Sequence, residues 1–169
     1  INKALKFIFV IFLTFFVFSC EKTQLFPVTA QVLLEKISSF KGNKAVLINI
    51  WALWCEPCVE EFPTIVQLNN ENEDLEVIFV SADFEEQFQE VKYFLKEQNA
   101  GSVSYIKRQK DELFINALNP NWSGSLPFTI IYGKDSGLII DYWEGKKSFS
   151  KFSEAINRAL ALDFARGIR

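Results

Sequence analysis

The chain has 169 residues, of which 49% are hydrophobic and 23% are charged, and it carries a formal net charge of −3 with no histidine. A chain of this size suits one globular domain, and the small negative charge without a basic cluster argues against a nucleic-acid partner. The absence of histidine excludes hydrolysis by a Ser-His or Cys-His pair. The three cysteines are therefore the first candidates for chemistry.

The N-terminal residues have the pattern of an export signal. Lys3 and Lys6 precede residues 7–18, which are apolar except for Thr14, and a polar stretch begins directly after Cys20. A basic segment followed by an apolar run of this length is typical of a signal peptide and is short for a transmembrane helix, which needs ~20 apolar residues. The pattern places the rest of the chain outside the cytosol.

Cys20 is a candidate for lipidation. Residues 17–20 resemble a bacterial lipobox, whose cysteine becomes the lipid-bearing first residue of the mature protein, although Phe18 is bulkier than usual there. Several acyl chains on Cys20 would anchor the protein to a membrane of the cell envelope, on the periplasmic side. Ordinary signal cleavage and an uncleaved anchor helix are the alternatives. The predicted organisation is an export signal, a short tether and one domain, over residues 1–19, 20–27 and 28–169.

The domain alternates predicted helices and strands. Apolar spacings of three and four predict helices over residues 28–40, 84–95 and 111–118, and from residues 58 and 148 onward. Apolar runs predict strands over residues 45–51, 75–82, 103–107, 128–132 and 138–143. Asp83, with Glu86 three residues later, fits a helix capping box. This order predicts an α/β sheet with parallel central strands and an antiparallel edge.

Cys55 and Cys58 form a Cys-x-x-Cys motif between a predicted strand and a predicted helix. The dipole and the free N–H groups of a helix N-terminus favour a thiolate, which lowers the pKa of such cysteines from ~8.5 to roughly 3.5–7.5. Cys55 is therefore the predicted nucleophile, and Cys58, inside the first turn, is the resolving thiol. Pro57 stiffens that turn, and Glu56 places a negative charge beside the thiolate, which favours a reducing pair.

Two close cysteines also suit a zinc site or a structural disulfide. A closed zinc site needs four Cys or His ligands, and only Cys20 remains, so no metal is expected. The lack of histidine also argues against a copper-binding relative. A disulfide across so short a loop adds little stability. A redox role is favoured, with the cysteine pair itself as the redox group and no other cofactor.

Residues 46–63 resemble the active-site segment of the exported TlpA/ResA-like thiol-disulfide oxidoreductases, which have the thioredoxin fold. Residues 125–127, Ser-Leu-Pro before a strand, resemble the cis-proline segment of that family. The helix and strand predicted between Asp83 and Lys107 resemble its insertion. The likeness covers about residues 28–165. It implies a central mixed sheet flanked by helices, with a helix-strand insertion between the active-site half and the cis-proline half.

The resemblance also implies how substrates are held. The peptide bond before Pro127 would be cis, and the backbone of Leu126 would pair with the substrate segment around its cysteine. A trans-proline that opens an edge strand is the alternative. Trp54 would pack beside the thiols and contact the substrate.

The source of the proton for the resolving cysteine is open. Asn49 occupies the position of a buried acid in thioredoxin, and an amide cannot replace that acid. This branch often draws an acid from the end of the next strand, where Asp83 and Glu85 are candidates. Glu60 and Glu61 are expected on a solvated helix face.

The predicted function is the reduction of protein disulfides by an exported, membrane-tethered monomer. An upstream thiol reductant, a transmembrane electron carrier, would reduce it again, and cytochrome c maturation or envelope redox homeostasis is a setting suggested by family likeness alone. The alternatives are a disulfide-forming oxidant, a thiol peroxidase, and a lipid-anchored binding or assembly module without enzymatic activity.

Overall fold

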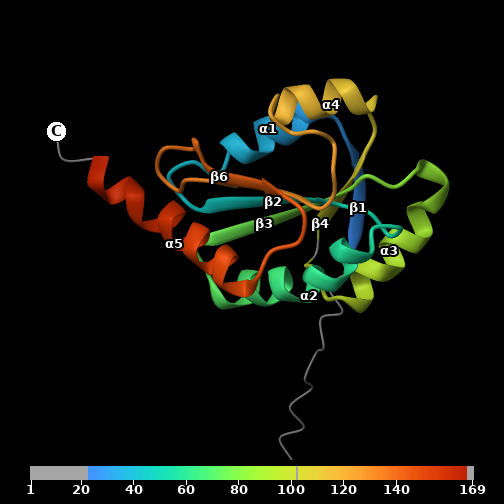
Figure 1. Ribbon diagram of the computed structural model, residues 1–169, viewed down its shortest axis with the longest axis horizontal. Coiled ribbons are helices and arrows are strands. Elements are labelled where there is room, and N and C mark those ends of the chain that lie inside the picture. The colour runs from blue at the N-terminus through green and yellow to red at the C-terminus, as the bar shows by residue number, and fades with distance from the viewer. Residues whose placement is uncertain (1–22, 102, 167–169) are drawn as a thin grey trace, which may run out of the picture.

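Helices and strands alternate along the part of the chain that the structure, a computed structural model, describes: residues 23–101 and 103–166 (Figure 1). The strands are β1 (Gln24–Val28), β2 (Ala45–Trp51), β3 (Leu75–Ser81), β4 (Val103–Lys107), β5 (Phe128–Tyr132) and β6 (Ile139–Glu144). The helices are α1 (Ala30–Ser38), α2 (Glu56–Glu71), α3 (Phe88–Glu97), α4 (Asp111–Leu118) and α5 (Phe149–Arg166), with a 3₁₀ turn η1 (Glu85–Gln87) before α3. From α1 onward the predicted alternation of helices and strands is confirmed, whereas β1 was not predicted.

In the described residues the strands form one six-stranded sheet in the order β1-β4-β3-β2-β5-β6. The first four strands in that order run parallel, whereas β5 is antiparallel to β2 and β6 is antiparallel to β5. The predicted insertion, α3 and β4, places its strand between β1 and β3. The mixed sheet of a thioredoxin-like fold is thus confirmed.

Helices cover both faces of the sheet (Figure 1). Helices α2, α3 and α5 pack on one face, and α1 and α4 pack on the other. Strand β2 is buried along its whole length, because its alternate side chains enter two different cores. Leu47 and Trp51 belong to the core under α2, whereas Ile48 and Ile50 belong to the core under α1 and α4.

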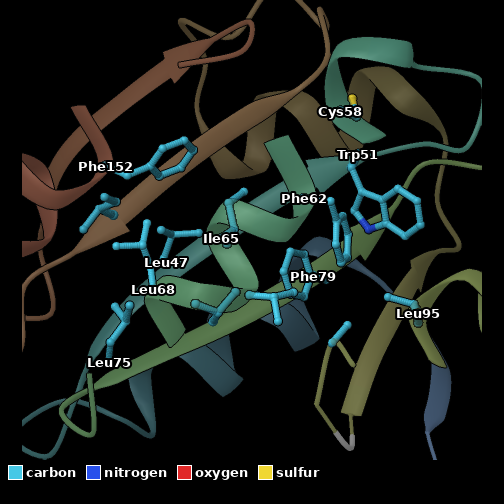
Figure 2. Packing of buried hydrophobic residues seen from close by; sticks show 14 of the residues in the cluster. Leu47, Trp51, Cys58, Phe62, Ile65, Leu68, Leu75, Phe79, Leu95 and Phe152 are labelled. Atoms are coloured by element: carbon cyan, nitrogen blue, oxygen red, sulfur yellow. The ribbon is translucent and has the colours of Figure 1, made fainter. Parts of the chain in front are cut away.

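Aromatic packing fixes the start of α2 on the sheet. Phe62 stacks on Phe79 at a centroid distance of 4.1 Å and meets the Trp51 indole edge-on at 4.9 Å. Figure 2 shows these rings in one layer, with Cys58 at its end. Since such aromatic contacts are close-packed, the first turns of α2 have a fixed position relative to β2 and β3.

The structure corrects two predicted boundaries. Residues 24–27, predicted to be tether, belong to strand β1, which pairs with β4 and buries Leu25. The helix predicted over residues 84–95 is divided into η1 and α3. Strand β1 was missed because its apolar run is short and contains Pro27, which argues against a strand except at the edge of a sheet.

The predicted export signal and Cys20 lie outside the described residues. No helix in residues 23–101 or 103–166 combines the length and the apolar composition that a membrane span requires.

Candidate active site

The two cysteines of the motif lie where β2 passes into α2. Cys55 is the N-cap of α2 and forms a disulfide with Cys58, at a Cα–Cα distance of 5.2 Å. Cys55 is 6% exposed, whereas Cys58 has no exposed surface. An incoming thiol or disulfide can therefore reach only the Cys55 sulfur. This order of access fits the predicted nucleophile and resolving thiol. Glu56 and Pro57, both exposed, form the turn between them.

The cis-proline segment lies at the same end of the sheet. The Leu126–Pro127 peptide bond is cis, as predicted. Phe128 pairs with Ile50, so this segment borders the loop that leads from β2 to Cys55. The position agrees with a substrate-binding role for Leu126 and Pro127, and that role stays a prediction.

Contacts from β6 hold the cis-proline segment. The Glu144 carboxylate accepts hydrogen bonds from the Ser123 N–H, at 2.7 Å, and from the Ser123 hydroxyl. These bonds lower the pKa of Glu144. The Gly145 N–H donates to the Pro127 carbonyl at 2.8 Å, and the Trp122 indole donates to the Ser125 carbonyl at 2.9 Å. The segment is therefore fixed on both sides of the cis bond.

A pocket of about 170 Å³ opens between the motif and the cis-proline segment. Its apolar walls are Trp54, Phe84, Phe114, Ile115, Trp122 and Leu126. Trp54 and Phe84 are 63% and 72% exposed. For comparison, a cavity of ~150 Å³ accommodates benzene. The pocket is large enough for one aromatic or branched side chain.

Asp83 anchors the loop before the motif, so its predicted role as a helix cap is wrong. It is 2% exposed, and both carboxylate oxygens accept the Leu53 N–H, at 3.0 and 3.1 Å. The Ser81 hydroxyl donates to the same carboxylate at 2.8 Å. Burial raises the pKa of Asp83, although the bonds from Ser81 and Leu53 oppose the shift. Asp83 thus connects the end of β3 to the residues directly before Cys55.

Replacing Asp83 with alanine is expected to destabilise the protein by about 1–3 kcal/mol, because the Leu53 N–H and the Ser81 hydroxyl lose their acceptor. Glu86→Ala is the matched control, since Glu86 is exposed in the same segment and would matter only if a capping box existed. Urea denaturation of both variants measures the difference. A larger loss in Glu86→Ala than in Asp83→Ala would contradict the anchoring role.

The expectation for Glu61 is also wrong. This residue was expected on a solvated face, but it is only 2% exposed. Desolvation raises its pKa from 4.5 to about 7, partly offset by the Lys147 N–H, the Asn49 amide and the charges of Lys146 and Lys147. The burial of Glu61 could have been predicted from the sequence. Glu61 follows Cys58 by three residues, so the two side chains lie on the same face of the helix.

Glu61 accepts hydrogen bonds from β2 and from the β6–α5 loop. The Asn49 Nδ2 donates to Glu61 Oε1 at 3.1 Å and to Thr129 Oγ1 at 3.1 Å. The Lys147 N–H donates to Glu61 Oε2 at 3.2 Å. A buried acid therefore lies one helical turn from Cys58, held by Asn49. The arrangement can accept and return a proton near neutral pH.

Two further glutamates near the motif, Glu60 and Glu85, are both exposed. Glu60 pairs with Lys146 at 2.6 Å, so the expectation of a solvated face is confirmed for Glu60. Glu85 pairs with Arg108. Neither has the burial that raised the pKa of Glu61.

The fold and the Cys55–Cys58 disulfide define a thioredoxin-like protein of the thiol:disulfide interchange class. The chain belongs to the AhpC/TSA family, whose model matches residues 27–158. It is similar to a thiol:disulfide interchange protein of Chlorobium tepidum TLS, with 26% identity and a TM-score of 0.60 over 72% of this chain and 83% of that chain. It is also similar to a putative thioredoxin of Neisseria meningitidis, with 27% identity and a TM-score of 0.56 over 72% of this chain and 77% of that chain.

A curated relative matches a shorter region. The thioredoxin-like protein YneN of Bacillus subtilis is 43% identical over 53 residues, which are 29% of this chain and 31% of that protein. The match thus spans about a third of the relative's length.

Proposed function

We propose that this protein reduces disulfide bonds of other proteins outside the cytosol. The observation that carries the proposal is the Cys55–Cys58 disulfide at the start of α2, with Cys58 fully buried and Glu61, an acid with a pKa of about 7, one turn behind it. A purely structural disulfide has no use for a buried acid of this pKa.

The proposed reaction has two exchange steps. In the reduced protein the Cys55 thiolate attacks one sulfur of the substrate disulfide, which breaks that bond, forms a mixed disulfide and releases the first substrate sulfur as a thiolate that takes a proton from water. Glu61 then takes the proton of Cys58, whose thiolate attacks the Cys55 sulfur, breaks the mixed disulfide and releases the second substrate sulfur as a thiolate that can take the proton held by Glu61. Two electrons pass to the substrate, and the protein is left with the Cys55–Cys58 disulfide.

The direction of exchange is tested by the reduction potential. Equilibration with thiol–disulfide buffers, followed by quantification of the Cys55–Cys58 disulfide, gives that potential directly. For a reductant of this fold the expected reduction potential is about −270 mV, and for a strong oxidant it is about −120 mV. A reduction potential close to about −120 mV would support disulfide formation and overturn the reducing role.

The apolar pocket supports protein segments as substrates. An extended segment paired with the backbone of Leu126 would direct alternate side chains to the same side, so a residue two positions from the substrate cysteine could enter the pocket. Its walls fit a leucine or phenylalanine side chain.

Phe84→Ala is expected to lower kcat/KM about fivefold for a disulfide peptide with leucine at that position, because the mutation removes ~1 kcal/mol of apolar contact. A peptide with alanine there should react equally well with both proteins. Tyr93→Ala is the matched control, since Tyr93 is a 66% exposed aromatic residue of α3 outside the pocket. Equal losses for both peptides would argue against a specificity pocket.

Export and lipid anchoring are proposed from the N-terminal pattern, with re-reduction by a transmembrane electron carrier. Cys20→Ala should shift the protein from the membrane fraction to the soluble fraction of cells, because the acyl chains would be lost. Fractionation followed by immunoblotting measures this shift. Unchanged partition into membranes would refute lipidation at Cys20.

A further inference from the structure

We propose that Asn49 is a positioning residue that presents either end of its side-chain amide to Glu61: the NH₂ group when Glu61 is charged and the carbonyl when Glu61 is protonated. The catalytic benefit of this rearrangement rests on the proposed function. The rearrangement itself does not, because protonation of Glu61 can be observed without turnover. The proposal gives the Asn49 amide a role beside a proton-transferring acid, although the amide itself cannot transfer a proton.

The observation behind the proposal is an unpaired buried atom. Asn49 has no exposed surface, and its Nδ2 makes both of its side-chain hydrogen bonds, to Glu61 and to Thr129. Its Oδ1 is buried and has no hydrogen-bond partner among the described residues. Buried acceptors are nearly always paired, so an unpaired one directly beside a titratable group needs an explanation.

The contacts in the structure fit a charged Glu61. Both carboxylate oxygens accept hydrogen bonds, Oε1 from Asn49 and Oε2 from the Lys147 N–H. A proton on Oε1 would face the Asn49 NH₂ group, and two donors would oppose each other. The amide can relieve this conflict by a half-turn about its last side-chain bond.

After the half-turn, Oδ1 takes the place of Nδ2. It can then accept a hydrogen bond from the protonated Glu61 and a second one from the Thr129 hydroxyl, which can donate as well as accept. The number of hydrogen bonds is the same before and after, and the NH₂ group then occupies the place in which Oδ1 has no partner in the structure. The half-turn changes only a side-chain torsion. The pairing of Asn49 with Phe79 on one side of β2 and with Thr129 on the other can therefore stay as it is.

Other side chains would not serve both states. Leucine would offer neither donor nor acceptor, and aspartate would place a second carboxylate against Glu61. The remaining groups around Glu61 are two ammonium groups and two neutral side chains. The β6–α5 loop contributes the ammonium groups of Lys146 and Lys147, and β2 and β5 contribute the neutral side chains of Asn49 and Thr129. On α2 itself, Cys58 is held in the disulfide.

The test is NMR spectroscopy of the oxidised, isotope-labelled protein between pH 5 and pH 9, with the Asn49 side-chain NH₂ resonances assigned. We expect these resonances to titrate together with the Glu61 carboxyl carbon. The NOE between the Asn49 NH₂ and Thr129 should be present at high pH and lost at low pH. In Glu61→Gln the resonances should be independent of pH, and the exposed Asn70 NH₂ group serves as the internal reference.

An NOE to Thr129 that persists over the whole pH range would overturn the proposal, whether or not the chemical shifts change. A second measurement uses Asn49→Leu, in which the midpoint of the Glu61 carboxyl titration should rise by less than about one pH unit, because hydrogen bonds to the charged and to the protonated form are lost together. A larger rise would mean that Asn49 bonds only the charged form and would overturn the proposal. Neither measurement depends on disulfide exchange, so a failure of the proposed function would show separately, as a reduced protein that does not reduce a disulfide peptide.

Discussion

Replacing Cys55 with serine is expected to lower the rate of insulin reduction by roughly three orders of magnitude or more, because a serine hydroxyl cannot replace the attacking thiolate. Cys58→Ala should behave differently. Its Cys55 can still attack, but nothing resolves the mixed disulfide, so a covalent adduct with the substrate should accumulate. The turbidity of reduced insulin measures the first effect, and non-reducing gel electrophoresis measures the second.

Cys20→Ala is the matched control for both variants, since it removes the remaining cysteine of the chain and leaves the pair intact. Wild-type rates in Cys55→Ser would contradict the enzyme hypothesis and favour a binding or assembly module. Consumption of hydrogen peroxide by the reduced protein would favour the peroxidase alternative. Adducts of Cys58→Ala isolated from the native host would identify the protein substrates.

Glu61→Gln is expected to change how stability depends on pH. The pKa of Glu61 is about 7 in the folded protein and 4.5 in its ordinary state, so the folded protein binds this proton more tightly than the unfolded chain does. The free energy of unfolding should therefore fall as the pH rises from 4.5 to 7, by roughly 3 kcal/mol from this group. Guanidinium denaturation of the oxidised protein at several pH values measures the slope.

In Glu61→Gln most of this slope should disappear. A smaller slope of the same sign should remain, because burial also raises the pKa of Asp83. Glu60→Gln is the matched control, since Glu60 is the exposed neighbour on the same helix. Equal slopes in wild type and Glu61→Gln would contradict the buried, protonatable state of Glu61.

The same variant tests the catalytic role of Glu61. If Glu61 takes the proton of Cys58, resolution of a preformed mixed disulfide should slow about 10²-fold at pH 7 and lose its dependence on a group titrating near that pH. Stopped-flow measurement of peptide release follows this step. A pH profile like that of the wild type would place the proton acceptor elsewhere, and Asp83 would be the next candidate.

Local sequence was sufficient for most elements. Each of these elements has an apolar pattern that is complete within a few residues: β2, β3, β4, α4 and β5. Such a pattern indicates which face of the element is buried. The place of the cysteine pair at the start of a helix was also predictable, because the helix N-terminus and the three-residue spacing are local features.

The surroundings of the thiols depended on distant residues. Glu61 is buried because Lys147, 86 positions away, and Asn49 on another element close over it. Asp83 anchors the loop before Cys55 across a separation of 30 residues. Strand β1 exists because β4 offers it a parallel partner.

By itself the sequence therefore determined the redox pair, its place at a helix start and the type of fold, since each depends on short-range spacing. Only the tertiary structure decided which acid is buried near the pair, because a charged side chain is buried by contacts that no local pattern contains.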